Sequence, residues 1–276
     1  TWDAMLNACD KLNAAGISPI GIGFKDGWWG GYMVSYLGQQ NFNSSQDLIA
    51  AVKGDKSLTD PMYSEWWSRW KELVDHKCFN DDQMSLDLYQ GQALFEQGKA
   101  AMTGAVQSYI AQLERKMGKD VVGVMRTPVY GTGKFKNAIG VPAQVLAITS
   151  FSTHKAEAAD FLRFLHTDAM MKSMYDTAGA VTPDLRFKAE WFNTNSDTTI
   201  NKWMQAYPLF WYQYYYPPVW ETEGSIALGQ LLVTGSITPE QAATKWQEVA
   251  VKDRQQNPGE LTDYAKWVLP PDMLSK

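Results

Sequence analysis

The chain has 276 residues, which is enough for two compact units that each have a core. Thirty acidic against 25 basic side chains give a net charge of −5, which argues against nucleic acid as a partner. Hydrophobic residues make up 45% and charged residues 20%, as in folded globular proteins, and no run of 18 apolar residues predicts a membrane span.

Aromatic residues make up 13% of the chain and include 12 tryptophans. Large rings fill cores, but they also form the platforms on which sugar rings stack, and composition alone favours the core. The three histidines, His76, His154 and His166, do not show metal-ligand spacing. No cofactor or metal is therefore expected, and the Gly-x-Ser-x-Gly elbow of hydrolases is absent.

The chain begins with a helix and a strand. Thr1 is a plausible N-cap of a helix that Gly16 ends, and residues 17–24 have the pattern of a buried strand. The helix that begins at Asp60-Pro61 places Trp66 and Trp70 on one apolar face, so these rings are expected in the core.

The loop after the first predicted strand is a candidate binding segment. In open α/β sheets the ligand crevice lies outside the carboxyl ends of the strands. Here Asp26 could bond sugar hydroxyls while Trp28 and Trp29 stack on a ring. Alternatively, the two indoles anchor a helix over residues 32–37, and the two interpretations are balanced.

Residues 91–110 predict a helix, a short strand at 100–102 and a second helix that begins at 105–108. Gly104 would bring bare backbone to a site, and Gln107 lies at the start of the second helix. The pair Gly98-Lys99 does not form a phosphate loop, because Ala occupies position 93 where that motif needs Gly.

Farther along, residues 121–125 predict a buried strand. Residues 139–148 are also strand-like, but Pro142 interrupts them and indicates an edge or a bulge. Gln144, inside this segment, is expected to face a binding site.

Residues 207–220 contain eight aromatics in fourteen positions. Strand alternation would place Tyr214 on one side and Trp211 on the other, and part of this double-sided segment should be exposed in a groove. Trp220, Glu221 and Glu223 follow and enter a helix. The two carboxylates could suggest a glycosidase, but acids two residues apart rarely flank one bond.

Several segments resemble extracellular solute-binding proteins of family 1 of ABC importers, the maltose-binding-protein-like sugar-binding proteins. The strongest is Phe95-x-x-Gly-Lys-Ala-Ala-Met followed by Gly104, which resembles a cleft-lining segment. Three further similarities are TWDAMLNACDKLNAAGISPI near the start, STHKAEAADFLRFLHTDAMM at 152–171, and the run from Trp220 through GQLLVTGSITPEQAATKWQEV.

The resemblance implies an α/β, periplasmic-binding-protein-like class II fold of two lobes, with a hinge between them. The similarity begins well inside the family's pattern, so we expect a C-terminal portion in which one lobe is incomplete. Residues 1–138 and 190–276 would form the C-terminal lobe, and residues 139–189 would be a helical remnant of the N-terminal lobe with the hinge crossings. Cys9 and Cys78 could be two buried thiols or one disulfide, and the family-like pattern favours the disulfide and an oxidising compartment.

The resemblance also implies a function: a monomeric solute-binding component that captures a sugar or oligosaccharide in an aromatic-lined interlobe cleft and presents it to an ABC permease. It would be periplasmic or extracellular, with a lipid anchor ahead of residue 1 left open. Alternatives are a glycoside hydrolase using Glu221 and Glu223, or a binding protein for another solute. The expected ligand-binding residues are Asp26, Trp28, Trp29, Gly104, Gln107, Gln144, Trp211, Trp220, Glu221 and Glu223.

Overall fold

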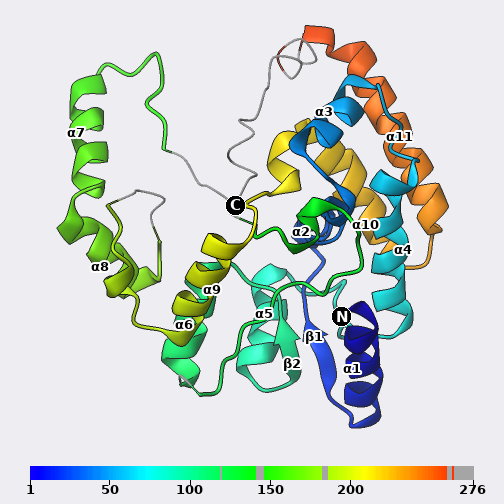
Figure 1. The fold of residues 1–276 in the computed structure, drawn as a ribbon, viewed down its shortest axis with the longest axis horizontal. Helices are drawn as coiled ribbons and strands as arrows, with labels where there is room; N and C mark the ends of the chain where they lie inside the picture. The colour runs from blue at the N-terminus through cyan, green and yellow to red at the C-terminus, as the bar shows by residue number, and fades with distance from the viewer. Residues whose placement is uncertain (119, 141–145, 182–185, 260–262, 264–276) are drawn as a thin grey trace. The chain divides into compact units, whose positions relative to one another are not determined.

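A computed structural model describes the chain except for residues 119, 141–145, 182–185, 260–262 and 264–276. The chain forms two compact units (Figure 1). Unit 1 comprises Thr1–Gly104, Arg126–Val141 and Ala206–Lys276, and unit 2 comprises Ala105–Met125 and Pro142–Gln205.

The unit boundaries differ from the predicted lobe boundaries, because residues 105–125 and 190–205 belong to unit 2. Side-chain bonds account for the difference. Gln107 donates to Asp197 (2.9 Å), and Arg115 donates to the Tyr175 carbonyl (3.0 Å), so residues 105–125 are bonded to later parts of unit 2. The correspondence of the two units to the two lobes of the family stays a prediction.

Unit 1 consists of helices and a short parallel sheet of two strands. Its helices and strands are α1 Trp2–Ala14, β1 Ser18–Gly21, α2 Trp28–Tyr36, η1 Gly38–Asn41, α3 Ser45–Lys53, α4 Pro61–Asp75, α5 Leu88–Glu96, β2 Ala100–Thr103, η2 Lys134–Asn137, η4 Tyr212–Tyr215, η5 Trp220–Ile226, α10 Ala227–Val233 and α11 Pro239–Gln256. Unit 2 is helical in its described residues: α6 Gln107–Met117, α7 Lys155–Leu165, α8 Asp168–Ala178, η3 Ala189–Trp191 and α9 Asn195–Ala206.

The two strands β1 and β2 pair in parallel, with Ser18 opposite Ala100 and Ile20 opposite Met102. Figure 1 shows them side by side, with α1 and α5 packed next to them. The predicted strand at 100–102 is confirmed, whereas the one at 17–24 is confirmed only to Gly21. After Gly21 the backbone no longer bonds to β2, and the Ile22 N–H donates instead to the Asn80 side chain (2.8 Å).

Local capping begins the helices where the sequence indicates. The Thr1 hydroxyl accepts from the Ala4 N–H (3.3 Å), and α4 follows Asp60 with Pro61 in its first turn. Cys9, within α1, and Cys78, after α4, are joined by a disulfide, with Cα atoms 5.1 Å apart. The bond ties the first helix of the chain to the end of the central helix α4.

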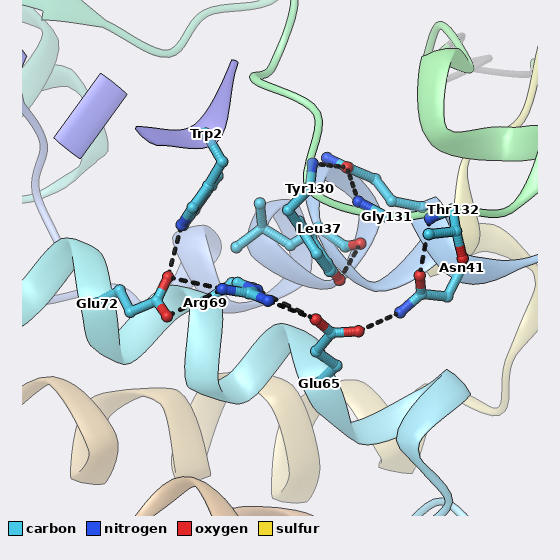
Figure 2. Close-up of polar contacts among 10 residues, drawn as sticks. Trp2, Leu37, Asn41, Glu65, Arg69, Glu72, Tyr130, Gly131 and Thr132 are labelled. Atoms are coloured by element: carbon cyan, nitrogen blue, oxygen red, sulfur yellow. Dashed lines mark hydrogen bonds and ion pairs between the residues drawn. The ribbon is translucent and has the colours of Figure 1, made fainter. Parts of the chain in front are cut away.

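A polar network fixes α1 and the 126–133 loop on α4 (Figure 2). Arg69 lies between Glu65 (2.7 Å) and Glu72 (3.0 Å), and Glu72 also accepts from the Trp2 indole (2.5 Å). The Arg69 guanidinium lies over the Tyr130 ring, 5.2 Å from its centroid. Partial burial lowers the Arg69 pKa, but the hydrogen bonds that Arg69 donates to Glu65 and Glu72 outweigh burial and raise it, so the guanidinium keeps its charge.

The interior of unit 1 is built on tryptophans. Trp66, Trp67 and Trp70 of α4 are stacked and buried, and Trp246 of the neighbouring helix α11 meets Trp66 edge-on at 5.6 Å. The prediction that Trp66 and Trp70 lie in the core is confirmed. Gly229 lets α10 approach Trp70, because a Cβ there would lie 2.3 Å from its ring.

The predicted buried strand at 121–125 is wrong. No strand is assigned to these residues, and the side chains of Val121 and Met125 are exposed. A short apolar run forms a strand only where a partner strand can pair with it. Among its described residues, unit 2 has no strand that could do so. Within the described part of the chain, no helix has the length and apolar character needed to cross a membrane.

Candidate functional site

The candidate site lies in unit 1, where the start of α2 meets the π-helix η5. Gly27, the N-cap of α2, has a positive φ of 75°, and a Cβ there would lie 2.3 Å from Ile226 Cγ2. At Gly30 a Cβ would lie 2.4 Å from the Ser225 carbonyl oxygen. The glycines therefore let α2 lie directly against η5, which brings the 26–32 segment close to Glu221.

Helix α2 carries a row of aromatic side chains at four-residue spacing, Trp28, Tyr32 and Tyr36, on one helix face. The Trp211 ring meets Tyr32 and Tyr36 edge-on, with centroids 6.1 and 5.3 Å apart. Trp28, at the end of this row, is 49% exposed. A half-exposed ring on the same helix face as further rings has the form of a stacking platform.

Trp29 has a different role from Trp28, because it is only 2% exposed. Its ring fills the space beside Gly104, where a Cβ would lie 2.2 Å from the Trp29 Cη2 atom. The Gly104 carbonyl is in turn held by the Gln92 side chain (2.9 Å). Of the two interpretations of the indole pair, Trp29 therefore fits the anchor and Trp28 fits the platform.

A hydrogen-bonded relay orients the carboxylate of Glu221. The Trp211 indole donates to Gln213 Oε1 (3.0 Å), and Gln213 Nε2 donates to Glu221 Oε1. Gly31 leaves room for the relay, since a Cβ there would lie 2.5 Å from Gln213 Nε2 and 2.6 Å from Glu221 Oε1. The Glu221 carboxylate is thus held next to the aromatic row.

The ionisable groups around Tyr32 are close enough to affect one another. Burial raises the pKa of Tyr32, and Tyr214, Tyr89, Asp26 and Glu221 raise it further. Burial also raises the pKa of Glu221, while the hydrogen bond from Gln213 lowers it. We call this region the aromatic–acidic face, and it consists of Asp26, Trp28, Tyr32, Tyr89, Trp211, Gln213, Tyr214 and Glu221.

Asp26 lies on the exposed side of this face. Its Oδ2 accepts from the Leu88 N–H at the start of α5 (3.1 Å), so the loop after β1 is fixed to the next helix. Tyr89, the residue after Leu88, is 74% exposed. One backbone contact therefore brings a carboxylate and a second exposed ring to the same place.

Other predicted site residues lie elsewhere. Trp220 is fully buried, and its indole donates to Asp253 (3.1 Å), so it is a core residue. Glu223 is exposed and pairs with Lys252 (3.6 Å) on α11. Gln107 lies in unit 2, and Gln144 lies outside the described residues. The aromatic–acidic face contains neither Trp220 nor Glu223, and Glu221 and Glu223 do not share one site.

The alternation expected across residues 207–220 is wrong. The segment contains the 3₁₀-helix η4, so Tyr212 and Tyr216 are buried while Tyr214 is 46% exposed. Tyr32, Tyr89, Gln213 and Tyr214 were not predicted as site residues. Tyr32 could have been found from its position four residues after Trp28 on a helix, and Gln213 as the single amide within the aromatic run.

The sequence model of the bacterial extracellular solute-binding protein family matches residues 1–172. This match covers more than half of the chain, and the chain belongs to that family. No curated protein matches it in sequence. Among the described residues, no cluster of three or more histidine, cysteine, aspartate or glutamate side chains could hold a metal ion.

Solved structures share the fold. A chitin oligosaccharide binding protein aligns over 91% of this chain and 64% of its own, with a TM-score of 0.77 and 23% identity. A sugar transporter protein from Bacillus licheniformis in complex with stachyose aligns over 89% and 64%, with a TM-score of 0.67 and 18% identity. A family 1 extracellular solute-binding protein from Bifidobacterium longum subsp. infantis aligns over 91% and 66%, with a TM-score of 0.65 and 21% identity.

These similarities confirm the predicted fold class, a part of the two-lobe α/β fold of the family. At such identities they show the fold alone. The chain spans about two thirds of the length of the solved proteins, 64% of the first two.

Proposed function

We propose that this chain is the solute-binding component of an ABC importer and that it binds a carbohydrate. The observation that carries the proposal is the aromatic–acidic face of unit 1, where exposed rings adjoin oriented carboxylates. Family membership supports a binding role. So do similar solved proteins that are described as binding chitin oligosaccharide, or as complexes with stachyose and raffinose.

The chemistry of the face suits a sugar. A pyranose ring has apolar C–H faces, which stack on aromatic rings, and a rim of hydroxyls, which need hydrogen-bond partners. Trp28 and Tyr214 supply half-exposed rings, and Glu221 and Asp26 supply acceptors for the hydroxyls. The relay from Trp211 through Gln213 holds Glu221 in place before ligand arrives, which lowers the entropic cost of binding.

A binding protein rather than a glycosidase is the better fit. A glycosidase needs two carboxyl groups flanking one bond, roughly 5 to 10 Å apart. Glu221 is bonded to Gln213 within the face, while Glu223 is paired with Lys252 on α11. This argues against Glu221 and Glu223 as a catalytic pair, and membership of a solute-binding family supports our proposal that the bound sugar leaves unchanged.

The setting follows from the family. We propose that the protein works outside the cytoplasmic membrane, as a monomer, and delivers its ligand to the transmembrane subunits of a permease. The Cys9–Cys78 disulfide is compatible with an oxidising compartment.

The test is a titration with neutral mono- and oligosaccharides, in which binding is monitored by isothermal calorimetry and by tryptophan fluorescence. Saturable binding is expected, with the sugar recovered unchanged by chromatography. Trp28→Ala should weaken binding about tenfold or more through loss of a stacking ring. Glu221→Gln should weaken it too, whereas its control Glu223→Gln, two residues away on the same helix, should not.

Two results would contradict the proposal. Cleavage of the sugar would show an enzyme. Binding of a non-saccharide solute with no response to any sugar would show that the aromatic rings serve another ligand.

A further inference from the structure

The hydrogen-bond polarity of the aromatic–acidic face is fixed by Trp211. An indole N–H can only donate, so the Gln213 oxygen must face it, 3.0 Å away. The Gln213 amide nitrogen is then directed to Glu221, where it donates. One of the two N–H donors of this amide is thus directed to a carboxylate within the protein.

Both carboxylates of the face keep one oxygen for a ligand. Glu221 uses Oε1 for Gln213, and Asp26 uses Oδ2 for the Leu88 N–H. Among the described residues, no hydrogen bond is made by Glu221 Oε2 or Asp26 Oδ1. The face therefore offers two oriented carboxylate acceptors beside aromatic rings.

The local field is negative. Two carboxylates, Asp26 and Glu221, lie close enough to Tyr32 to raise its pKa, so both disfavour a further negative charge on this face. Lys25 is exposed next to Asp26 in the same loop, and its ammonium group could oppose this field.

We propose that this face selects neutral or cationic saccharides over those that carry carboxylate groups, with Glu221 as the main acceptor. The inference rests on the proposed carbohydrate function and names the class of sugar. A hydroxyl or ammonium group donates to the available oxygens. A uronate also has hydroxyls, but its carboxylate meets like charges on this face, and this repulsion lowers its affinity.

The experiment compares saccharides of similar size and different charge by calorimetry at neutral pH. The probes are tri-N-acetylchitotriose and raffinose (neutral), the glucosamine trimer (cationic) and trigalacturonate (anionic). At least one neutral or cationic probe should bind, and trigalacturonate should bind at least about tenfold more weakly. Glu221→Gln should weaken binding of the preferred probe and reduce the difference in affinity between that probe and trigalacturonate. Glu223→Gln and Lys25→Gln should leave the order unchanged.

The outcomes separate the two claims. If trigalacturonate binds as tightly as the best neutral or cationic probe, the charge selection is wrong while the carbohydrate function stands. If Lys25→Gln then abolishes trigalacturonate binding, the positive charge of Lys25 outweighs the negative charges of the two carboxylates. If none of these probes and no other saccharide binds, the proposed function fails and the selection fails with it.

Discussion

Two adjacent glycines of α2 allow the packing at the site to be measured directly. Gly30 and Gly31 are both buried in the same helix, so alanine at either position should gain the same helix propensity, roughly 0.8–1 kcal/mol. The neighbours differ. A Cβ at Gly30 would lie 2.4 Å from the Ser225 carbonyl oxygen and 2.6 Å from Ile226 Cα, whereas one at Gly31 would lie 2.5 Å from Gln213 Nε2.

The backbone of η5 cannot move without disturbing Trp220 and Gly224, which pack against Trp246. Gly30→Ala should therefore lower the free energy of unfolding by about 2–3 kcal/mol, net of the gain in helix propensity. The side chains of Gln213 and Glu221 can rotate away, so Gly31→Ala should stay within about 1 kcal/mol of the parent protein. Its effect should instead be on the ligand, with affinity falling about tenfold as Glu221 is displaced.

The assay is urea unfolding followed by tryptophan fluorescence, together with calorimetric titration of the sugar. The comparison is internal, because residue type, helix and propensity are the same in both variants. Equal stability of the two variants would refute the close approach of α2 to η5. Unchanged sugar affinity in Gly31→Ala would refute the role given to the relay.

Three further predictions concern charge, covalent linkage and the core. Burial raises the pKa of Glu221 from its ordinary 4.5, so folding favours the protonated carboxyl. The carboxyl therefore contributes its full stability below pH 4.5, its ordinary pKa, and this contribution is lost as pH rises through the raised pKa of the folded protein. Glu221→Gln should not show this loss when the free energy of unfolding is measured from pH 4 to 8. Replacing Cys9 and Cys78 by serine should cost roughly 4 kcal/mol, since the bond closes a loop with a sequence separation of 69, and a reductant should then have no further effect. Asp253→Ala should cost about 1–3 kcal/mol by leaving the buried Trp220 indole without its acceptor, with sugar affinity unchanged; a loss of affinity would return Trp220 to the site.

Local elements were predictable because their causes are local. The Thr238-Pro239-Glu240-Gln241 segment has the pattern of a capping box, and the structure shows the Thr238 side chain bonded to the Gln241 N–H. Trp66 and Trp70 were assigned to the core from helical spacing alone. In both cases the interacting residues lie within a few positions of one another, so the printed sequence contains the whole argument.

The segment after residue 207 required the tertiary structure. Its composition predicted aromatic rings at a site, and Trp211 and Tyr214 do lie on the aromatic–acidic face. The predicted alternation failed because the chain turns into a 3₁₀-helix there instead of extending as a strand. Which rings are exposed depends on packing against residues far away in sequence, such as Ser35, whose hydroxyl accepts from the Gln213 N–H (3.0 Å).

The sequence by itself determined the family, the helices with local caps, and the kinds of side chain that a sugar site needs. It could not separate Glu221 from Trp220 and Glu223, which are neighbours in the chain. The tertiary structure separates them because η5 is a π-helix pressed between α2 and α11. Glu221 lies on the side facing Gln213 and Gly31, Trp220 is enclosed by the core, and Glu223 reaches Lys252. The direction of a side chain on such a helix is set by long-range packing, and no local pattern specifies it.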